Sequence, residues 1–150
     1  MQPDVIISSN GHIFRKELLA LPKLACINRH TSLLPRYGGL WPVLQAMLND
    51  EKQIGQTIHT MTTTIDAGYI LAQEKFDVSP DTTLYGIYAQ SFRNAPALIR
   101  QAIDNLIADK KITMPPADKS YFSHPTAEQG KLFRVNHRFF RIGELIRRCE

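Results

Sequence analysis

The chain of 150 residues is 43% hydrophobic and 21% charged, the composition of one globular domain large enough to bury its own core. Its two cysteines, Cys26 and Cys149, cannot build a disulfide framework, and no apolar run is long enough to span a bilayer, which favours a soluble cytoplasmic protein. The net charge of +4 comes entirely from residues 131–150, with six Lys or Arg against two Asp or Glu, and does not indicate a basic nucleic-acid-binding domain.

The first 30 residues have the pattern of a strand, a helix and a second strand. Residues 5–7 are a β-branched run typical of a buried strand, residues 14–21 have helical apolar spacing, and residues 24–27 are a second apolar run. Strands joined by a helix pair in parallel, which predicts an α/β sheet that binds ligands beyond the carboxyl ends of its strands. Asn28 and His30 follow the second strand and therefore lie where a site is expected.

The middle of the chain predicts a helix and a pair of strands. A turn-rich loop over residues 35–39 leads into a helix over residues 40–49, whose apolar residues share one face. Residues 56–61 alternate as a strand, and residues 69–78 are its expected partner. Asp66 falls in the connection between these two strands and is therefore expected on a loop.

The remaining regular structure is predicted to be helical. Residues 82–94 form one helix, and Pro96 either kinks it or starts a second helix that runs to Asp109. A further helix is expected over residues 126–133, and the pattern beyond it is ambiguous.

We expect a main domain over residues 1–116 and a C-terminal extension over residues 117–150. The extension interleaves basic residues with Phe133, Phe139 and Phe140. This composition favours a solvated basic face whose aromatic side chains pack on the core or on a partner, and the alternative is a surface that binds RNA or an acidic partner.

Asn28, His30 and Asp66 supply an amide, an imidazole and a carboxylate, the groups needed to move an acyl group onto an amine. The amide and an imidazolium can stabilise the oxyanion of a tetrahedral intermediate, and the carboxylate can favour the charged imidazole and accept protons. Taken singly, each has an ordinary alternative: a capping Asn, a hydrogen-bonded His and a turn-forming Asp. No cluster with the spacing of metal ligands is visible, so we expect no metal site.

These residues sit in segments that resemble the folate-dependent formyltransferases, which include the methionyl-tRNA, glycinamide ribonucleotide and amino-sugar formyltransferases. The matching segments are Pro3-Asp4-Val5-Ile6-Ile7, Ile27-Asn28-Arg29-His30, Ser32-Leu33-Leu34-Pro35-Arg36-Tyr37 with Gly39, Gln56-Thr57-Ile58-His59, Ile65-Asp66-Ala67-Gly68-Tyr69-Ile70-Leu71-Ala72-Gln73 and Tyr121-Phe122-Ser123-His124-Pro125-Thr126. The resemblance covers nearly the whole chain. It implies a Rossmann-like α/β fold with a mostly parallel sheet flanked by helices, and a transferase that takes its formyl group from 10-formyltetrahydrofolate.

The resemblance also implies roles for individual residues. Asn28 and His30 stabilise the oxyanion, and Asp66 raises the pKa of His30 and handles protons. Residues expected to contact the pterin of the folate are Gly11, His12, Ile13, Phe14, Thr62, Thr63 and Thr64. His59 is expected to act behind the site or in packing. A cis peptide is implied between Leu34 and Pro35, although a trans bond is the commoner form for such a pair.

One departure from the family is large, because its members open with several βα units before the Pro-Asp-Val-Ile strand and this chain begins at that strand. The chain thus resembles the second half of a catalytic domain, and we expect a fragment, a truncated reading frame, or a chain that a homodimer or a separate partner completes. We expect a small amine acceptor, such as an amino sugar, rather than methionyl-tRNA, because no RNA-binding domain is appended. The alternatives are a 10-formyltetrahydrofolate hydrolase and a non-catalytic formyltransferase-like module.

Overall fold

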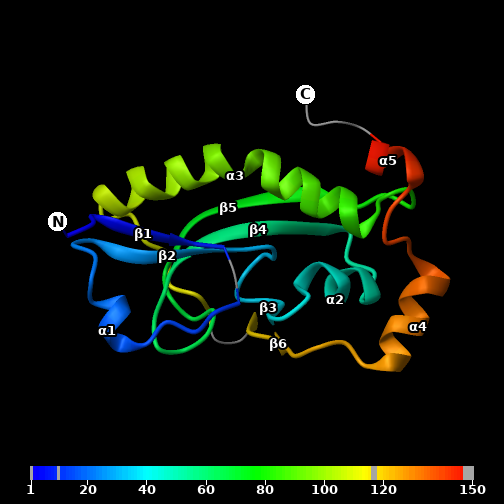
Figure 1. Cartoon of the computed structure of the whole chain (residues 1–150), viewed down its shortest axis with the longest axis horizontal. Coiled ribbons are helices and arrows are strands. Elements are labelled where there is room, and N and C mark those ends of the chain that lie inside the picture. Colours follow the sequence, from blue (N-terminus) through cyan, green and yellow to red (C-terminus); the bar gives the residue numbers. More distant parts are fainter. Residues whose placement is uncertain (1, 10, 116–117, 147–150) are drawn as a thin grey trace.

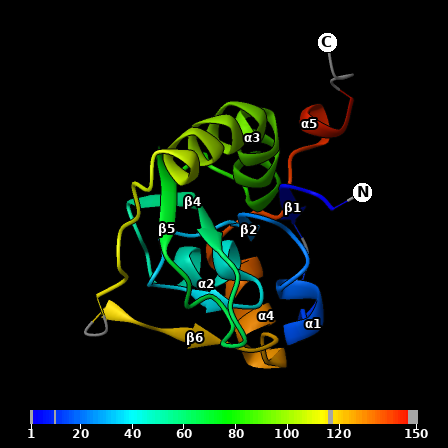
Figure 2. The ribbon, with the colours of Figure 1, turned by 90° about the vertical axis from the view of Figure 1, so that its left-hand side faces the viewer.

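The computed structural model describes residues 2–9, 11–115 and 118–146, and Figure 1 shows the arrangement of the elements. In chain order the elements are β1 (Val5–Ser8), α1 (Lys16–Leu19), β2 (Ala25–His30), β3 (Gly38–Gly39), α2 (Pro42–Leu48), β4 (Gln53–Thr60), β5 (Ile70–Asp77), α3 (Leu84–Ile107), β6 (Tyr121–Phe122), α4 (Ala127–Asn136) and α5 (Ile142–Ile146). A central sheet separates α3 from α1, α2 and the β3–β6 pair, as both views show (Figures 1 and 2). The expected α/β architecture is confirmed.

The central sheet has the strand order β1-β2-β4-β5. Its β1–β2 pair is parallel, as the strand, helix and strand pattern predicted. The β2–β4 and β4–β5 pairs are antiparallel, so the sheet is mixed rather than mostly parallel. The β4–β5 connection over residues 61–69 holds no helix, and a parallel pair would need a longer crossover than this loop provides.

Two buried apolar clusters stabilise the fold. One joins Ile27 of β2 and Ile58 of β4 to Leu98, Ala102 and Leu106 of α3. The other surrounds α2, and its members are Tyr37, Val43, Leu44, Ala46, Met47, Ile54, Phe76, Leu84, Ile87 and Phe133. Both clusters contain residues of α3, so this helix packs on the sheet along its length (Figure 1).

Several elements differ from the predicted bounds. The first helix is shorter than residues 14–21, because Arg15 is extended and caps α1, which begins at Lys16. The next helix begins at Pro42, since proline is favoured in the first helical turn and Trp41 has a left-handed backbone. Pro96 lies inside the single helix α3 and neither ends it nor starts another. None of the helices in the described residues is long and apolar enough to cross a membrane.

The C-terminal segment packs against α2 through α4. A capping box of Thr126 and Gln129 starts α4 where the sequence predicted a helix. Phe133 is fully buried beside the ring of Phe139, 4.7 Å between centroids, whereas Phe140 is half exposed. The expected division of the chain at residues 116 and 117 falls outside the described residues and stays a prediction.

Candidate active site

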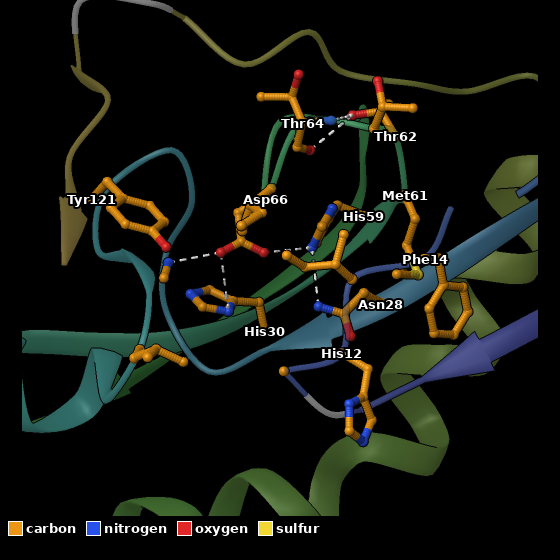
Figure 3. Close-up of a pocket in the computed structure, with 16 residues that line it drawn as sticks. His12, Phe14, Asn28, His30, His59, Met61, Thr62, Thr64, Asp66 and Tyr121 are labelled. Atoms are coloured by element: carbon orange, nitrogen blue, oxygen red, sulfur yellow. Dashed lines mark hydrogen bonds and ion pairs between the residues drawn. The ribbon is translucent and has the colours of Figure 1, made fainter. Parts of the chain in front are cut away.

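One cavity of about 250 Å³ collects every residue that the sequence proposed for catalysis or folate binding. These residues are Gly11, His12, Ile13, Phe14, Asn28, His30, Thr62, Thr63, Thr64 and Asp66. The cavity lies where β2 and β4 present polar side chains and is walled by the loops before α1 and between β4 and β5 (Figure 3). The sequence stretches are separated by up to 55 positions, so only the sheet brings them together.

The pairing of β2 with β4 places three polar side chains on one face of the sheet. Asn28 and His30 are two residues apart on β2 and so point to the same side. His59 of β4 lies directly opposite Asn28 in the strand register. All three are buried, and all line the cavity. The cross-strand position makes His59 part of the cavity wall itself, and its expected role behind the site or in packing stays a prediction.

Asp66 is held in the cavity by backbone geometry. Its own backbone is left-handed, with φ at 49°, and its Oδ2 accepts a hydrogen bond of 2.7 Å from the N–H of Gly39. Gly39 has φ at +90°, and a Cβ there would lie 2.1 Å from the carbonyl oxygen of Phe122. Gly68 closes the loop against β4, where a Cβ would lie 1.7 Å from the carbonyl oxygen of Thr60. Glycine is therefore required both at position 39, whose N–H bonds Asp66, and at position 68 in the Asp66 loop.

The loop that follows His30 is fixed by hydrogen bonds to the sheet. The N–H of Leu34 donates to Thr57 Oγ1 over 3.1 Å, and that hydroxyl donates to the carbonyl of Ser32 over 2.7 Å. Gln73 of β5 donates to the carbonyl of Leu34 over 2.8 Å. The Leu34–Pro35 peptide is cis, the form that the resemblance implied rather than the commoner trans form.

The ring of His30 has a defined orientation. Nε2 lies 2.8 Å from the carbonyl oxygen of Tyr37, which can only accept, so Nε2 carries a proton. Nδ1 faces Asp66, 3.8 Å from Oδ2. Burial lowers the pKa of His30 more than the neighbouring Asp66 raises it, so the ring is neutral at pH 7. Asp66 thus acts on the pKa of His30 in the expected direction, and desolvation opposes it more strongly.

The carboxylate of Asp66 stays ionised. Burial by itself would raise the pKa of Asp66, but the neighbouring His59 and His30 rings and the N–H of Gly39 together hold it below its ordinary value. Oδ1 lies 3.5 Å from His59 Nε2. The dashed lines in Figure 3 show Asp66 between the two imidazoles. Asp66 is thus the negative charge of the cavity and a weak base.

Asn28 offers a hydrogen-bond donor to the cavity. Its Nδ2 lies 3.4 Å from His59 Nε2, and the other ring nitrogen of His59 donates to the Thr60 carbonyl over 2.9 Å. An amide Nδ2 has two N–H groups, so one can point to His59 and the second remains for a ligand. Oδ1 of Asn28 is buried without a hydrogen-bond partner among the described residues. An unsatisfied buried oxygen of this kind is typical of a functional position.

The predicted pterin wall has the chemistry of a flat heteroaromatic site. Ile13 and Phe14 supply apolar surface on one side. On the other side Thr62 and Thr64 form a tight turn, in which Thr62 Oγ1 donates to the Thr64 carbonyl over 2.9 Å. The N–H of Thr64 donates back to Thr62 Oγ1 over 3.2 Å, which leaves the backbone groups of the exposed residues Thr62 and Thr63 to bond the polar edge of a ring. Leu40, Met61 and Tyr121 also line the cavity, although the sequence analysis did not predict them as site residues.

Tyr121 could not have been assigned to the site from local pattern. It reaches the cavity because β6 pairs in parallel with β3, an association of two-residue strands more than 80 positions apart. Met61 could have been found, since it directly follows β4 at the edge that carries His59.

The chain belongs to the formyl transferase family. The family profile, described as formyl transferase, matches residues 1–103, and the resemblance seen in the sequence is thereby confirmed. The site geometry agrees with that class, since it places an amide, an imidazole and a carboxylate at one cavity.

Curated relatives are methionyl-tRNA formyltransferases. The enzyme of Borrelia garinii subsp. bavariensis is 37% identical over 71% of this chain and 34% of its own length. That of Borrelia turicatae is 30% identical over 99% of this chain and 48% of its own length. The chain therefore spans between one third and one half of the curated relatives it matches.

Solved structures of sugar N-formyltransferases share the fold. An N-formyltransferase from Helicobacter canadensis, in complex with folinic acid and dTDP-3-aminofucose, matches 81% of this chain and 46% of its own, with 27% identity and a TM-score of 0.69. The formyltransferase PseJ from Anoxybacillus kamchatkensis, in complex with a UDP-linked formamido sugar and tetrahydrofolate, covers 88% of this chain and 69% of its own at 25% identity and a TM-score of 0.70.

Proposed function

We propose that this chain carries the formyl-transfer site for moving a formyl group from 10-formyltetrahydrofolate to a primary amine. The observation that carries the proposal is the convergence of Asn28, His30 and Asp66 on one cavity whose walls suit a pterin. The folate complexes of the sugar N-formyltransferases support the choice of donor. Apolar Ile13 and Phe14 with the backbone of Thr62 and Thr63 fit a flat ring with a polar edge.

Asn28 and His30 divide the work of the addition step. As the amine nitrogen bonds to the formyl carbon, the second N–H of Asn28 donates to the oxygen that gains negative charge, a contribution commonly worth about 3–4 kcal/mol. His30 enters neutral, so its Nδ1 can take the proton that the attacking nitrogen loses. Asp66, already ionised, then stabilises the imidazolium across the 3.8 Å between Nδ1 and Oδ2.

His30 also completes the breakdown step. It returns its proton to the folate nitrogen as the bond between that nitrogen and the formyl carbon breaks, which leaves a formamide and tetrahydrofolate. The same ring therefore acts as base and then as acid. In this assignment Asp66 orients and stabilises His30, and its low pKa makes it the weaker candidate for the proton acceptor.

The acceptor is proposed to be an amino sugar or another small amine. Relatives of the chain include enzymes for methionyl-tRNA and for nucleotide-linked amino sugars, so the family by itself does not select between them. In the described residues β1 is an edge strand of the central sheet, with Ile7 half exposed, so this edge can pair with a further strand.

A transfer assay tests the proposal. The chain is incubated with 10-formyltetrahydrofolate labelled in the formyl group and with dTDP-3-aminofucose as the probe amine. We expect label in the sugar amide, and about 10²-fold to 10³-fold less of it with Asn28→Ala. Asp50→Asn is the matched control for Asp66→Asn, because Asp50 shares the left-handed backbone of Asp66 but is exposed and distant from the cavity.

Two results would contradict the proposal. Release of labelled formate without any amide would indicate the hydrolase. Equal amounts of labelled amide from the wild-type chain and from Asn28→Ala would show that the cavity does not catalyse the transfer.

A further inference from the structure

Arg29 lies between the two motif residues and points to the opposite side of β2. Side chains alternate along a strand, so Asn28 and His30 face the catalytic cavity while Arg29 faces α3. Its side chain is buried, with 8% of the residue exposed. The guanidinium donates from Nε to Ser9 Oγ over 2.9 Å and from Nη1 to Ser91 Oγ of α3 over 2.6 Å.

The charge of Arg29 is not neutralised by any carboxylate in the described part of the chain. Its hydrogen-bond acceptors are hydroxyl and amide oxygens, including Gln56 Oε1 at 3.5 Å. Glu74 is the acidic group of this network, but Gln56 stands between, donating to Glu74 Oε2 over 2.9 Å. Burial accordingly lowers the pKa of Arg29. A buried cation without an anion is costly, and such groups are ordinarily paired.

The guanidinium opens onto a second cavity of about 250 Å³ beside the first. Aromatic side chains line it: Trp41, Tyr88 and Phe92. The Phe92 ring lies 4.2 Å from the guanidinium carbon and is 60% exposed, so it covers one face of the cation without closing the cavity. Residues common to both cavities are Gly11, Asn28, His30, Gly39 and Leu40.

The end of β1 explains why this cavity is open. The parallel register ends with Ser8 opposite Asn28, so β1 does not extend beside the last two residues of β2. On the other edge of β2, Arg29 and His30 remain paired with Ile58 and Thr57 of β4. Among the described residues, the backbone at Arg29 is therefore paired with β4 on one edge and has no partner strand on the other.

We propose that this second cavity, named here the Arg29 cleft, binds an anionic group of the amine acceptor, a phosphate or a carboxylate. A guanidinium matches both groups geometrically, and hydrogen bonds between charged partners are about twice as strong as neutral ones. The aromatic walls suit the sugar or base that carries the anion. Because the two cavities share Asn28 and His30, an acceptor held in the cleft has its amine within the catalytic cavity. This last step rests on the proposed function, whereas binding of the anion does not.

Titration of the full chain with simple anions tests the cleft without any catalysis. The Nε–H of Arg29 is buried and hydrogen-bonded, so its nitrogen-15 NMR signal is a direct reporter. Inorganic phosphate and acetate are added separately at low ionic strength, where screening is weak. We expect a saturable shift of the Arg29 signal with at least one of them, and the stronger ligand identifies the group that the acceptor carries.

Variants separate the cleft from non-specific charge. We expect Arg29→Met to weaken anion binding by at least about tenfold and Arg29→Lys to retain part of it. The control is Arg100→Met, which removes an exposed positive charge from α3 and is expected to leave anion binding unchanged. An unshifted wild-type Arg29 signal at saturating phosphate and acetate would overturn the proposal even if Arg29→Met failed to fold. Equal binding by Arg29→Met would overturn it as well.

A pair of amines links the cleft to turnover. Glucosamine 6-phosphate and glucosamine differ only in the phosphate, so we expect a KM at least about tenfold lower for the former. Arg29→Met is expected to remove that difference. A KM difference that survives in Arg29→Met contradicts the proposal. Failure of every amine to be formylated would instead contradict the proposed function, and the NMR titration would still decide on the cleft.

Discussion

The two faces of β2 and β4 differ in what they contribute. Toward α3, Ile27 and Ile58 join a dry cluster that needs no polar partner. Toward the cavity, Asn28, His30 and His59 are equally buried but polar. Alternation along two paired strands thus lets adjacent residues serve stability and chemistry. Burial therefore stabilises the fold on the apolar face, whereas on the polar face it shifts the pKa of ionisable groups such as His30.

Arg29 is the exception that marks where the apolar face ends. It follows Ile27 on the same side of β2, yet it is bonded to Ser91 rather than packed in the cluster. On the α3-facing side of β2, the apolar core therefore ends at Ile27 and the proposed Arg29 cleft begins at the next residue on that side, Arg29.

Truncation on the apolar face should give the largest effect on stability. Ile58→Ala removes buried methyl groups from the cluster under α3 and is expected to lower the free energy of unfolding by about 2–5 kcal/mol. Ile107→Ala, on an exposed position of the same helix, should change it by less than about 0.5 kcal/mol. Urea denaturation measures both. Formyl transfer per folded molecule should be unchanged in Ile58→Ala, and a large loss there would break the separation of the two faces.

Truncation on the polar face should act on the reaction instead. Asn28→Ala removes the amide donor and is expected to lower kcat by about 10²-fold to 10³-fold. Its effect on unfolding should be only about 1 kcal/mol, since the hydrogen bond lost to His59 is long. Steady-state kinetics and urea denaturation on the same preparation give the two numbers. A loss of stability as large as that of Ile58→Ala would contradict the assignment of this face to chemistry.

Backbone close to the site should tolerate no added methyl group. Gly68→Ala places a Cβ against the Thr60 carbonyl, so we expect a loss of about 1–3 kcal/mol in stability together with lower activity, because the Asp66 loop shifts. Gly130→Ala is the matched control: no atom lies within 4 Å of its added Cβ, and it sits in α4. There alanine should raise stability by up to about 1 kcal/mol. Thermal unfolding distinguishes them, and an unaffected Gly68→Ala would show that the loop is not fixed as described.

The smallest effect concerns the pKa of His30. Its folded pKa lies below the unfolded value of about 6.5, so the unfolded state binds more protons and stability rises with pH up to about 6.5, then levels off. Asp66→Asn removes the charge that raises this pKa, so the midpoint should fall further. NMR titration of the ring measures it, with Asp50→Asn as the unchanged control. A midpoint above 6.5, or an upward shift in Asp66→Asn, would contradict this account.

Much of the fold and site could be predicted because the informative residues are local. The β1–β2 pair followed from two apolar runs around a helical segment, and Asn28 and His30 followed from their place after the second run. Asp66 was assigned to a loop between two strands and lies there. In each case the pattern and the contact involve neighbours in sequence.

The errors came from long-range contacts and burial. The antiparallel β2–β4 pairing and the position of Tyr121 depend on segments that local periodicity does not connect. The lowered pKa of His30 depends on how completely the folded chain removes the ring from water, which no spacing of residues reports. Arg29 went unused for the same reason, because an arginine beside two motif residues looks like a solvated charge until its burial is known.

Calorimetric titration with a non-hydrolysable 10-formyltetrahydrofolate analogue tests the central claim most directly. Ile13→Asp changes an exposed side chain on the cavity wall, 69% exposed, and Ile142→Asp makes the same change on α5 at 75% exposure. We expect micromolar binding by the wild-type chain, at least about tenfold weaker binding by Ile13→Asp, and no change for Ile142→Asp. A folded chain that does not bind the analogue, or an Ile13→Asp variant that binds as tightly as wild type, would show that this cavity is not the folate site.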